Sequence, residues 1–224
     1  FIGSYFGSKS RFLSAASPFI AVLLTLLIGC LIFAGMGKDP MHSMYVFIVE
    51  PLLTLRGWGE LGVKMTPLIL CALGLLVCYR ANVWNIGAEG QLIVGALAGG
   101  VVALQVSPEA SQLYMIWVIL AAMVGGALYA GIVAWLKDKC NANEILVSLM
   151  LVYIAELFLS WAVQSPLRDP QGLGFPQSPM FETAATLPIM IPGTRMHWGG
   201  ALVCFALFGI WLIMSKMFIG FQVR

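Results

Sequence analysis

The stretch Arg80-Ala-Asn-Val-Trp-Asn-Ile-Gly-Ala-Glu-Gly-Gln91 interrupts an otherwise apolar run that extends from Thr66 to Val106. The apolar residues 66–79 before it would form a helix of about 21 Å at 1.5 Å per residue, which is shorter than the roughly 30 Å hydrocarbon core of a bilayer. Unless this helix begins earlier, near Gly59, the break lies within the inner half of the membrane. Non-helical backbone is tolerated there only when it is buried in protein or lines a wet cavity. The stretch therefore predicts a broken or re-entrant helix near residues 80–91.

The composition places this break in a membrane protein. Of the 224 residues, 60% are hydrophobic and only 10% are charged, against roughly 25% charged residues in soluble domains. This excludes a disordered chain and argues strongly against a water-soluble domain. The net charge of +2 leaves no basic surface for nucleic acid, so no nucleic-acid partner is expected. We predict an all-α fold, a polytopic transmembrane helical bundle.

Six apolar segments are predicted to span the membrane, and together they form a single transmembrane domain over residues 1–224. They are 18–36, 66–79, 84–106, 113–136, 145–163 and 198–217. The shorter apolar stretch Met44–Leu55 contains Glu50 and Pro51, so we expect an interfacial or external helix there. Because the chain starts at Phe1 and stops at Arg224 directly after an apolar stretch, we also expect it to be truncated at its C-terminus.

The positions of Lys and Arg in the loops predict the orientation, since these residues are enriched on the cytoplasmic side. With the N-terminus inside, seven of them are cytoplasmic and five are external. The cytoplasmic ones are Lys9, Arg11, Arg80, Lys137, Lys139, Lys216 and Arg224, and the external ones are Lys38, Arg56, Lys64, Arg168 and Arg195. We therefore expect a multi-pass protein of the cell (inner) membrane with a cytoplasmic N-terminus.

Polar residues within the break are candidates for a substrate pathway. Asn85 is a plausible N-cap of the helix that follows, and this helix would then direct its free N–H groups at the cavity. Glu89, one turn into that helix, is a carboxylate within the membrane and therefore a functional candidate. It could instead satisfy nearby backbone N–H groups or pair with Arg80. The candidate pathway residues are Asn82, Asn85, Glu89 and Gln91, with Tyr153 and Glu156 from the segment 145–163. The last two share a helix face and could equally form a buried structural hydrogen bond.

Small residues at four-residue spacing predict close helix packing. Gly87, Gly95 and Gly99 recur on one face of the helix after the break, and Gly126 belongs to a matching stripe of small residues in segment 113–136. Such stripes let two helix backbones approach closely. A packing seam is favoured over a substrate surface, and the two stripes are candidates to face each other.

The short polar loop 137–144 is predicted to be cytoplasmic. Asn143 can cap the helix that follows, with Glu144 at the favourable positive end of that helix. A turn that merely starts a helix explains these residues locally. The alternative is a surface of Lys139, Asn143 and Glu144 that contacts a cytoplasmic partner.

Catalytic and metal-binding motifs are missing from the sequence. It contains no P-loop, no GxSxG and no HExxH motif, and its five cysteines and two histidines show no metal-ligand spacing. We therefore expect no catalytic residue, no metal and no cofactor, and do not expect an enzyme. Energy for active transport would come from another chain or from an ion gradient.

The run Lys64-Met-Thr-Pro-Leu-Ile-Leu, followed by Asn82-Val-Trp-Asn-Ile-Gly-Ala-Glu-Gly-Gln-Leu-Ile-Val-Gly-Ala96, resembles the inner-membrane permease subunits of ABC importers. The resemblance is to the simple-sugar and nucleoside permease branch. Asn143–Ala155 is similar to a second segment of that family, although Val152 stands where the family often has Asn. Lys216–Arg224 resembles the lead-in to the family's cytoplasmic coupling segment.

The resemblance implies half of a type II-like importer that forms the translocation pathway for a nucleoside or a simple sugar. It further implies two ATP-binding ABC subunits that hydrolyse ATP, a second permease chain that makes a homo- or heterodimer, and an external solute-binding protein. Lys139, Asn143 and Glu144 would then contact the ATPase. Two alternatives remain open at this point: an ion-coupled secondary transporter and a non-transporting membrane scaffold.

Overall fold

The computed structural model describes residues 9–223. Within this range the chain is helical apart from its connections and one isolated antiparallel bridge between Ile189 and His197. The described chain divides into two compact units, one up to Leu61 and one from Gly62 onward. Within residues 9–223, five helices are long and apolar enough to cross a membrane. The predicted all-α polytopic fold is confirmed.

The first unit holds a long apolar helix and a set of short helical turns. Helix α1 (Lys9–Gly35) is followed by α2 (Pro40–Met44), the π-helical turn η1 (Tyr45–Val49) and α3 (Glu50–Leu53). The side chain of Asp39 starts α2 by accepting hydrogen bonds from the backbone N–H groups of Met41 and His42. The stretch expected to be one interfacial helix is therefore helical but consists of consecutive short pieces.

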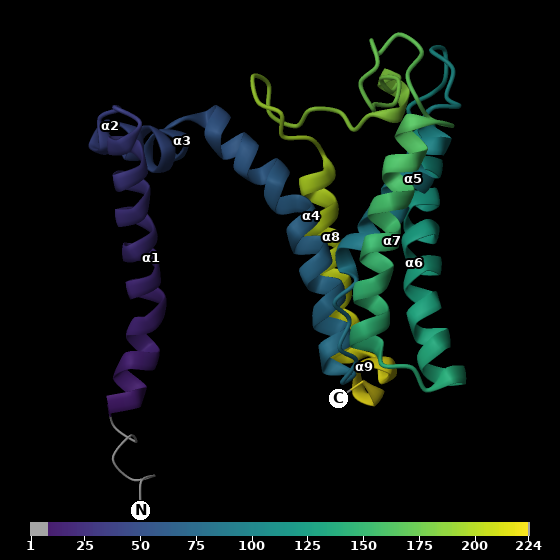
Figure 1. Ribbon diagram of the computed structural model, residues 1–224. Coiled ribbons are helices and arrows are strands. Elements are labelled where there is room, and N and C mark those ends of the chain that lie inside the picture. Colours follow the sequence, from purple (N-terminus) through teal and green to yellow (C-terminus); the bar gives the residue numbers. More distant parts are fainter. Residues whose placement is uncertain (1–8, 224) are drawn as a thin grey trace, which may run out of the picture. The chain divides into compact units, whose positions relative to one another are not determined.

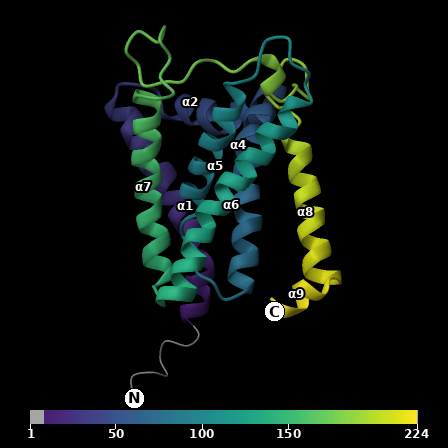
Figure 2. The same cartoon turned by 90° about the vertical axis from the view of Figure 1, so that its right-hand side faces the viewer.

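The second unit contains most of the bundle. Helix α4 (Leu55–Arg80) enters it and is followed by α5 (Ala88–Ala103), α6 (Tyr114–Cys140) and α7 (Glu144–Gln164). The short η2 (Thr183–Ala185), then α8 (Gly199–Lys216) and α9 (Phe218–Gln222), complete it. Helices α5, α6 and α7 lie side by side (Figures 1 and 2). The break and the turn between α6 and α7 therefore lie at the same end of this unit.

The structure corrects the lengths of the two helices beside the break. Helix α4 has 26 residues, or about 39 Å, so the span before the break is long and not short as the segment 66–79 suggested. Helix α5 has 16 residues, or about 24 Å, and does not fill the predicted segment 84–106. The hydropathy of the first turns of α4 is lowered by the charged residues Glu60 and Lys64, so the predicted segment began too late. The short helix therefore follows the break.

Asparagines in the left-handed backbone region end α4 and α6. Asn82 has φ 56°, and the N–H groups of Asn82 and Val83 donate to the carbonyls of Tyr79 and Cys78 at 3.1 and 2.9 Å. This is the Schellman arrangement, in which the residue after the helix takes a left-handed conformation. Asn141, with φ 51°, ends α6 in the same region. After glycine, asparagine tolerates this region best.

The connection between α7 and α8, residues 165–198, forms an ordered cap at the opposite end of the unit. Ala184 and Ala185 of η2 are buried against Ala103 and Val106 at the end of α5. The bridge between Ile189 and His197 closes the segment that returns to α8. Such packing by small apolar side chains is inconsistent with a plain extended linker.

Candidate functional site

The break is held together by a pair of side-chain amides. Oδ1 of Asn85 accepts hydrogen bonds from the backbone N–H of Gly87 at 2.9 Å and from Nε2 of Gln91 at 3.3 Å. Nδ2 of Asn85 donates in turn to Oε1 of Gln91 at 3.4 Å. Asn85 is only 9% exposed, so its paired amide avoids the cost of an unsatisfied buried polar group.

The expectation that Asn85 is the N-cap of the next helix is wrong. The N-cap of α5 is Gly87, and no side chain caps it. Asn85 stands two residues earlier and bonds to the N–H of Gly87, which is the local turn that asparagine side chains favour. The Asn85 amide therefore pairs with Gln91 and does not cap α5.

A cavity of about 310 Å³ lies between α4, α5 and α6, and the amide pair lines it. Both polar groups come from the break and the first turn of α5. The remaining lining is mostly apolar and comes from Leu70, Cys71, Gly74, Leu75, Cys78, Ala88, Leu92 and Ala130. Two convergent amides in an apolar wall are a common design for small-molecule sites. They offer both donors and acceptors to an uncharged polar ligand.

The other predicted pathway residues lie elsewhere. Glu89, Tyr153 and Glu156 are exposed on α5 and α7 and do not line this cavity. Among the described residues, Glu89 forms no ion pair with Arg80. Asn82 is the exposed residue that ends α4. The structure thus brings together Asn85 and Gln91 but not the other four.

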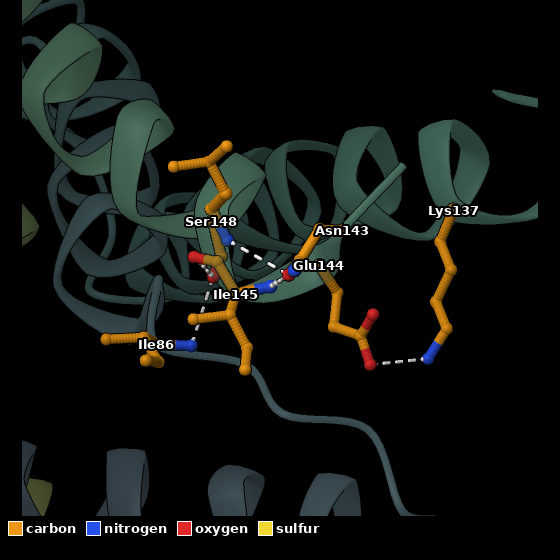
Figure 3. A network of polar contacts seen from close by, with 7 residues as sticks. Ile86, Lys137, Asn143, Glu144, Ile145 and Ser148 are labelled. Carbon is orange, nitrogen blue, oxygen red and sulfur yellow. Dashed lines mark hydrogen bonds and ion pairs between the residues drawn. The ribbon is translucent and has the colours of Figure 1, made fainter. Parts of the chain in front are cut away.

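A residue that the sequence did not single out, Ser148, holds the break against α7. Its hydroxyl accepts a hydrogen bond from the backbone N–H of Ile86 at 3.1 Å and donates to the carbonyl of Ile145 at 3.1 Å (Figure 3). Ser148 is fully buried, with 0% exposure. The only sequence signal was a serine in the apolar segment 145–163, one turn after the helix start.

Glycines bring the backbones of α5, α6 and α7 into close contact. A Cβ on Gly95 would lie 2.8 Å from the carbonyl oxygen of Ala122 in α6, and a Cβ on Gly99 would lie 3.1 Å from the Ala122 Cβ. From the opposite side, a Cβ on Gly126 would lie 3.1 Å from the Gln91 carbonyl oxygen. The two stripes of small residues therefore face each other. Gly87 instead approaches α7, where a Cβ would lie 3.1 Å from the Ser148 Cβ.

The turn between α6 and α7 carries the residues predicted to contact a partner. Oδ1 of Asn143 accepts from the N–H groups of Ile145 and Leu146, so Asn143 caps α7 as predicted. Glu144 pairs with Lys137 at 2.7 Å (Figure 3). Asn143 and Glu144 thus serve the local structure, while Lys139 is exposed beside Asp138 at 3.0 Å. Of the three, Lys139 is the side chain most open to a partner.

Comparison with known proteins identifies the family. A family model described as the branched-chain amino acid transport system / permease component matches residues 59–224. A glucose ABC transporter permease of Haloferax volcanii is 38% identical over 94% of this chain and 58% of its own length. A guanosine ABC transporter permease of Bacillus subtilis is 28% identical over 92% of this chain and 60% of its own length. No solved structure matches the chain.

A third relative agrees with these two. A nucleoside ABC transporter permease of Lactococcus lactis is 31% identical over 66% of this chain and 41% of its own length. The chain thus spans about half the length of the curated relatives it matches. The predicted resemblance to the sugar and nucleoside permease branch is confirmed by these names, and the family model covers most of the chain. The chain belongs to the branched-chain amino acid transport system / permease component family.

Proposed function

We propose that this chain belongs to the membrane-spanning subunit of an ATP-driven importer and helps to form the pathway for a sugar or a nucleoside. Its family membership and the transport functions of the relatives named above support this reading. The structural observation that carries it is the Asn85–Gln91 pair in the wall of the cavity between α4, α5 and α6. Sugars and nucleosides are uncharged and rich in hydroxyl groups, so amide donors and acceptors suit both.

Partner chains complete the proposal. The sequence holds no P-loop, so ATP would be hydrolysed by separate ATP-binding subunits on the cytoplasmic side. A second permease chain would complete the pathway, and an external solute-binding protein would deliver the substrate. The proposed orientation places the N-terminus and the α6–α7 turn in the cytoplasm, where Lys139 would face the ATPase.

The proposal also includes three predicted pathway residues that do not line the cavity, namely Glu89, Tyr153 and Glu156. They are exposed on helices whose sequence is otherwise apolar, and a carboxylate facing lipid is costly. We propose that a second permease chain, or another part of the full-length protein, covers these faces. The pathway would then extend from the amide pair to this covered surface.

Uptake measurements test the proposed function directly. Cells that express the full-length protein with its neighbouring transport genes should accumulate radiolabelled glucose or guanosine, and depletion of ATP should stop this accumulation. Uptake that persists without ATP and follows the proton or sodium gradient would favour the ion-coupled alternative. No flux of either probe, together with no retained ATPase subunit on purification, would favour the scaffold alternative.

A further inference from the structure

Ser148 joins two segments that are 62 residues apart in the sequence. Ser148 lies one turn into α7. Its hydroxyl makes two hydrogen bonds, one within α7 and one with the non-helical break. The donated bond goes to the carbonyl of Ile145 in its own helix, and the accepted bond comes from Ile86 in the break. The donated bond orients the hydroxyl so that its lone pair faces the break.

The break needs such a partner for its backbone. Ile86 precedes α5 and has no carbonyl of that helix to bond to, and an unpaired backbone N–H group that is shielded from water is costly. Ser148 satisfies this N–H, and Asn85 satisfies the next one, at Gly87. Two successive N–H groups are thus held by side chains. We infer that the orientation of the Asn85 amide, which pairs with Gln91, depends on both of these hydrogen bonds.

Steric contact on the same face leaves the break little room to move relative to α7. A Cβ on Gly87 would lie 3.1 Å from both Cβ and the carbonyl oxygen of Ser148. A Cβ on Gly90, one turn further along α5, would lie 3.0 Å from the Cα of Val152. Glycine at both positions lets the break and the first turn of α5 lie directly on α7.

The α6–α7 turn is connected to the same segment. Glu144 is held by Lys137 at 2.7 Å. Asn143 fixes the first turn of α7, from which Ser148 projects. Figure 3 shows the Lys137–Glu144 pair, the cap made by Asn143, and the bonds of Ser148 to Ile145 and Ile86. The turn and the break are therefore connected through the first turn of α7 and the hydroxyl of Ser148.

We propose that Ser148 is a positioning residue that ties the Asn85–Gln91 pair to the α6–α7 turn, so that displacement of this turn reaches the wall of the cavity. The inference deepens the proposed function, because a cytoplasmic ATPase would act on the turn and the substrate on the amide pair. The bond between Ser148 and Ile86, which attaches the break to α7, can be tested whether or not the protein transports a substrate.

Hydrogen–deuterium exchange of the purified full-length protein tests the attachment. Ser148→Ala removes the acceptor for Ile86 without adding bulk, so amide exchange in the peptide 84–91 should become about tenfold faster. Ser215→Ala is the matched control, since its hydroxyl bonds to the Trp211 carbonyl within α8, and it should leave this peptide unchanged. Equal exchange in the wild type and Ser148→Ala would overturn the proposal.

The ratio of substrate transported to ATP hydrolysed tests the connection in the reconstituted complex. Ser148→Ala should lower this ratio severalfold for glucose or guanosine, whereas Ser215→Ala should not. A residue with only a structural role would reduce the amount of assembled complex and leave the ratio unchanged, and an unchanged ratio would refute the transmission. If the wild type takes up neither probe with ATP, the proposed function fails, while the exchange comparison still decides whether Ser148 holds the break.

Discussion

The contact between α5 and α6 can be tested by adding a single methyl group at Gly95. The new Cβ of Gly95→Ala would lie 2.8 Å from the carbonyl oxygen of Ala122, where ordinary contact begins at 3.4 Å. The two helices must therefore separate by about 0.6 Å, or the carbonyl must tilt. Overpacking of this kind typically costs about 1–3 kcal/mol.

A matched control separates this steric cost from helix propensity. Alanine is a better helix former than glycine by about 1 kcal/mol, which would partly conceal the effect. Gly131→Ala adds the same methyl group within α6, where no described atom outside the neighbouring turns of the same helix lies within 4 Å. The difference between the two variants therefore reports the contact alone, and Gly95→Ala should be the less stable by about 1–3 kcal/mol.

Thermal unfolding of the purified protein in detergent measures this difference. For a chain of this size, 1 kcal/mol corresponds to about 2–4 °C in Tm, so Gly95→Ala should unfold roughly 2–12 °C below Gly131→Ala. Equal Tm values, or a higher value for Gly95→Ala, would show that α5 and α6 are not in backbone contact at this position. That result would refute the packing described above.

Three further predictions concern asparagines at helix ends and at the break, and the same unfolding assay checks them. Asn143→Ala should lower the free energy of unfolding by about 1 kcal/mol, because it removes the side-chain acceptor at the start of α7; an unchanged Tm would contradict the cap. Asn141→Gly should be nearly neutral while Asn141→Val costs at least about 1 kcal/mol, since φ at this position is 51°; equal stability of the two would contradict the left-handed conformation. Asn85→Ala should destabilise by about 1–3 kcal/mol and by more than Gln91→Ala, because only Asn85 also binds the Gly87 N–H; the reverse order would exclude this turn.

Features that depend on neighbouring residues in the sequence were predictable. Each of the six apolar segments overlaps a helix, although the segment 84–106 begins within the break, and the polar stretch between residues 80 and 91 contains a real interruption. Asn143 caps α7 as predicted, because a cap is a bond between residues two or three apart. Hydropathy and the cap at Asn143 depend on residues that are close together in the sequence, so the sequence alone reveals them.

The facing stripes of small residues on α5 and α6 were predictable, but several other features that depend on contacts between distant residues were not. The charges of Glu60 and Lys64 hid the first turns of α4, although a helix tolerates them. The choice of Gly87 over Asn85 as N-cap depends on Gln91 being available to the Asn85 amide. Ser148 finds its partner 62 residues away, and no periodicity within an apolar segment signals such a bond. Long-range pairing of this kind requires the three-dimensional arrangement.

The cap over the ends of α5 and α6 also has a practical consequence for labelling. Its anchor is the small cluster around Ala184 and Ala185, whereas its tip at Leu173 is 95% exposed and is followed by Gly174 with φ 92°. Exposed tips of this kind are the sites where inserted sequence is best tolerated. An epitope inserted between Leu173 and Gly174 would leave the anchor intact. Antibody access to that epitope in intact cells would then report which side of the membrane the cap occupies.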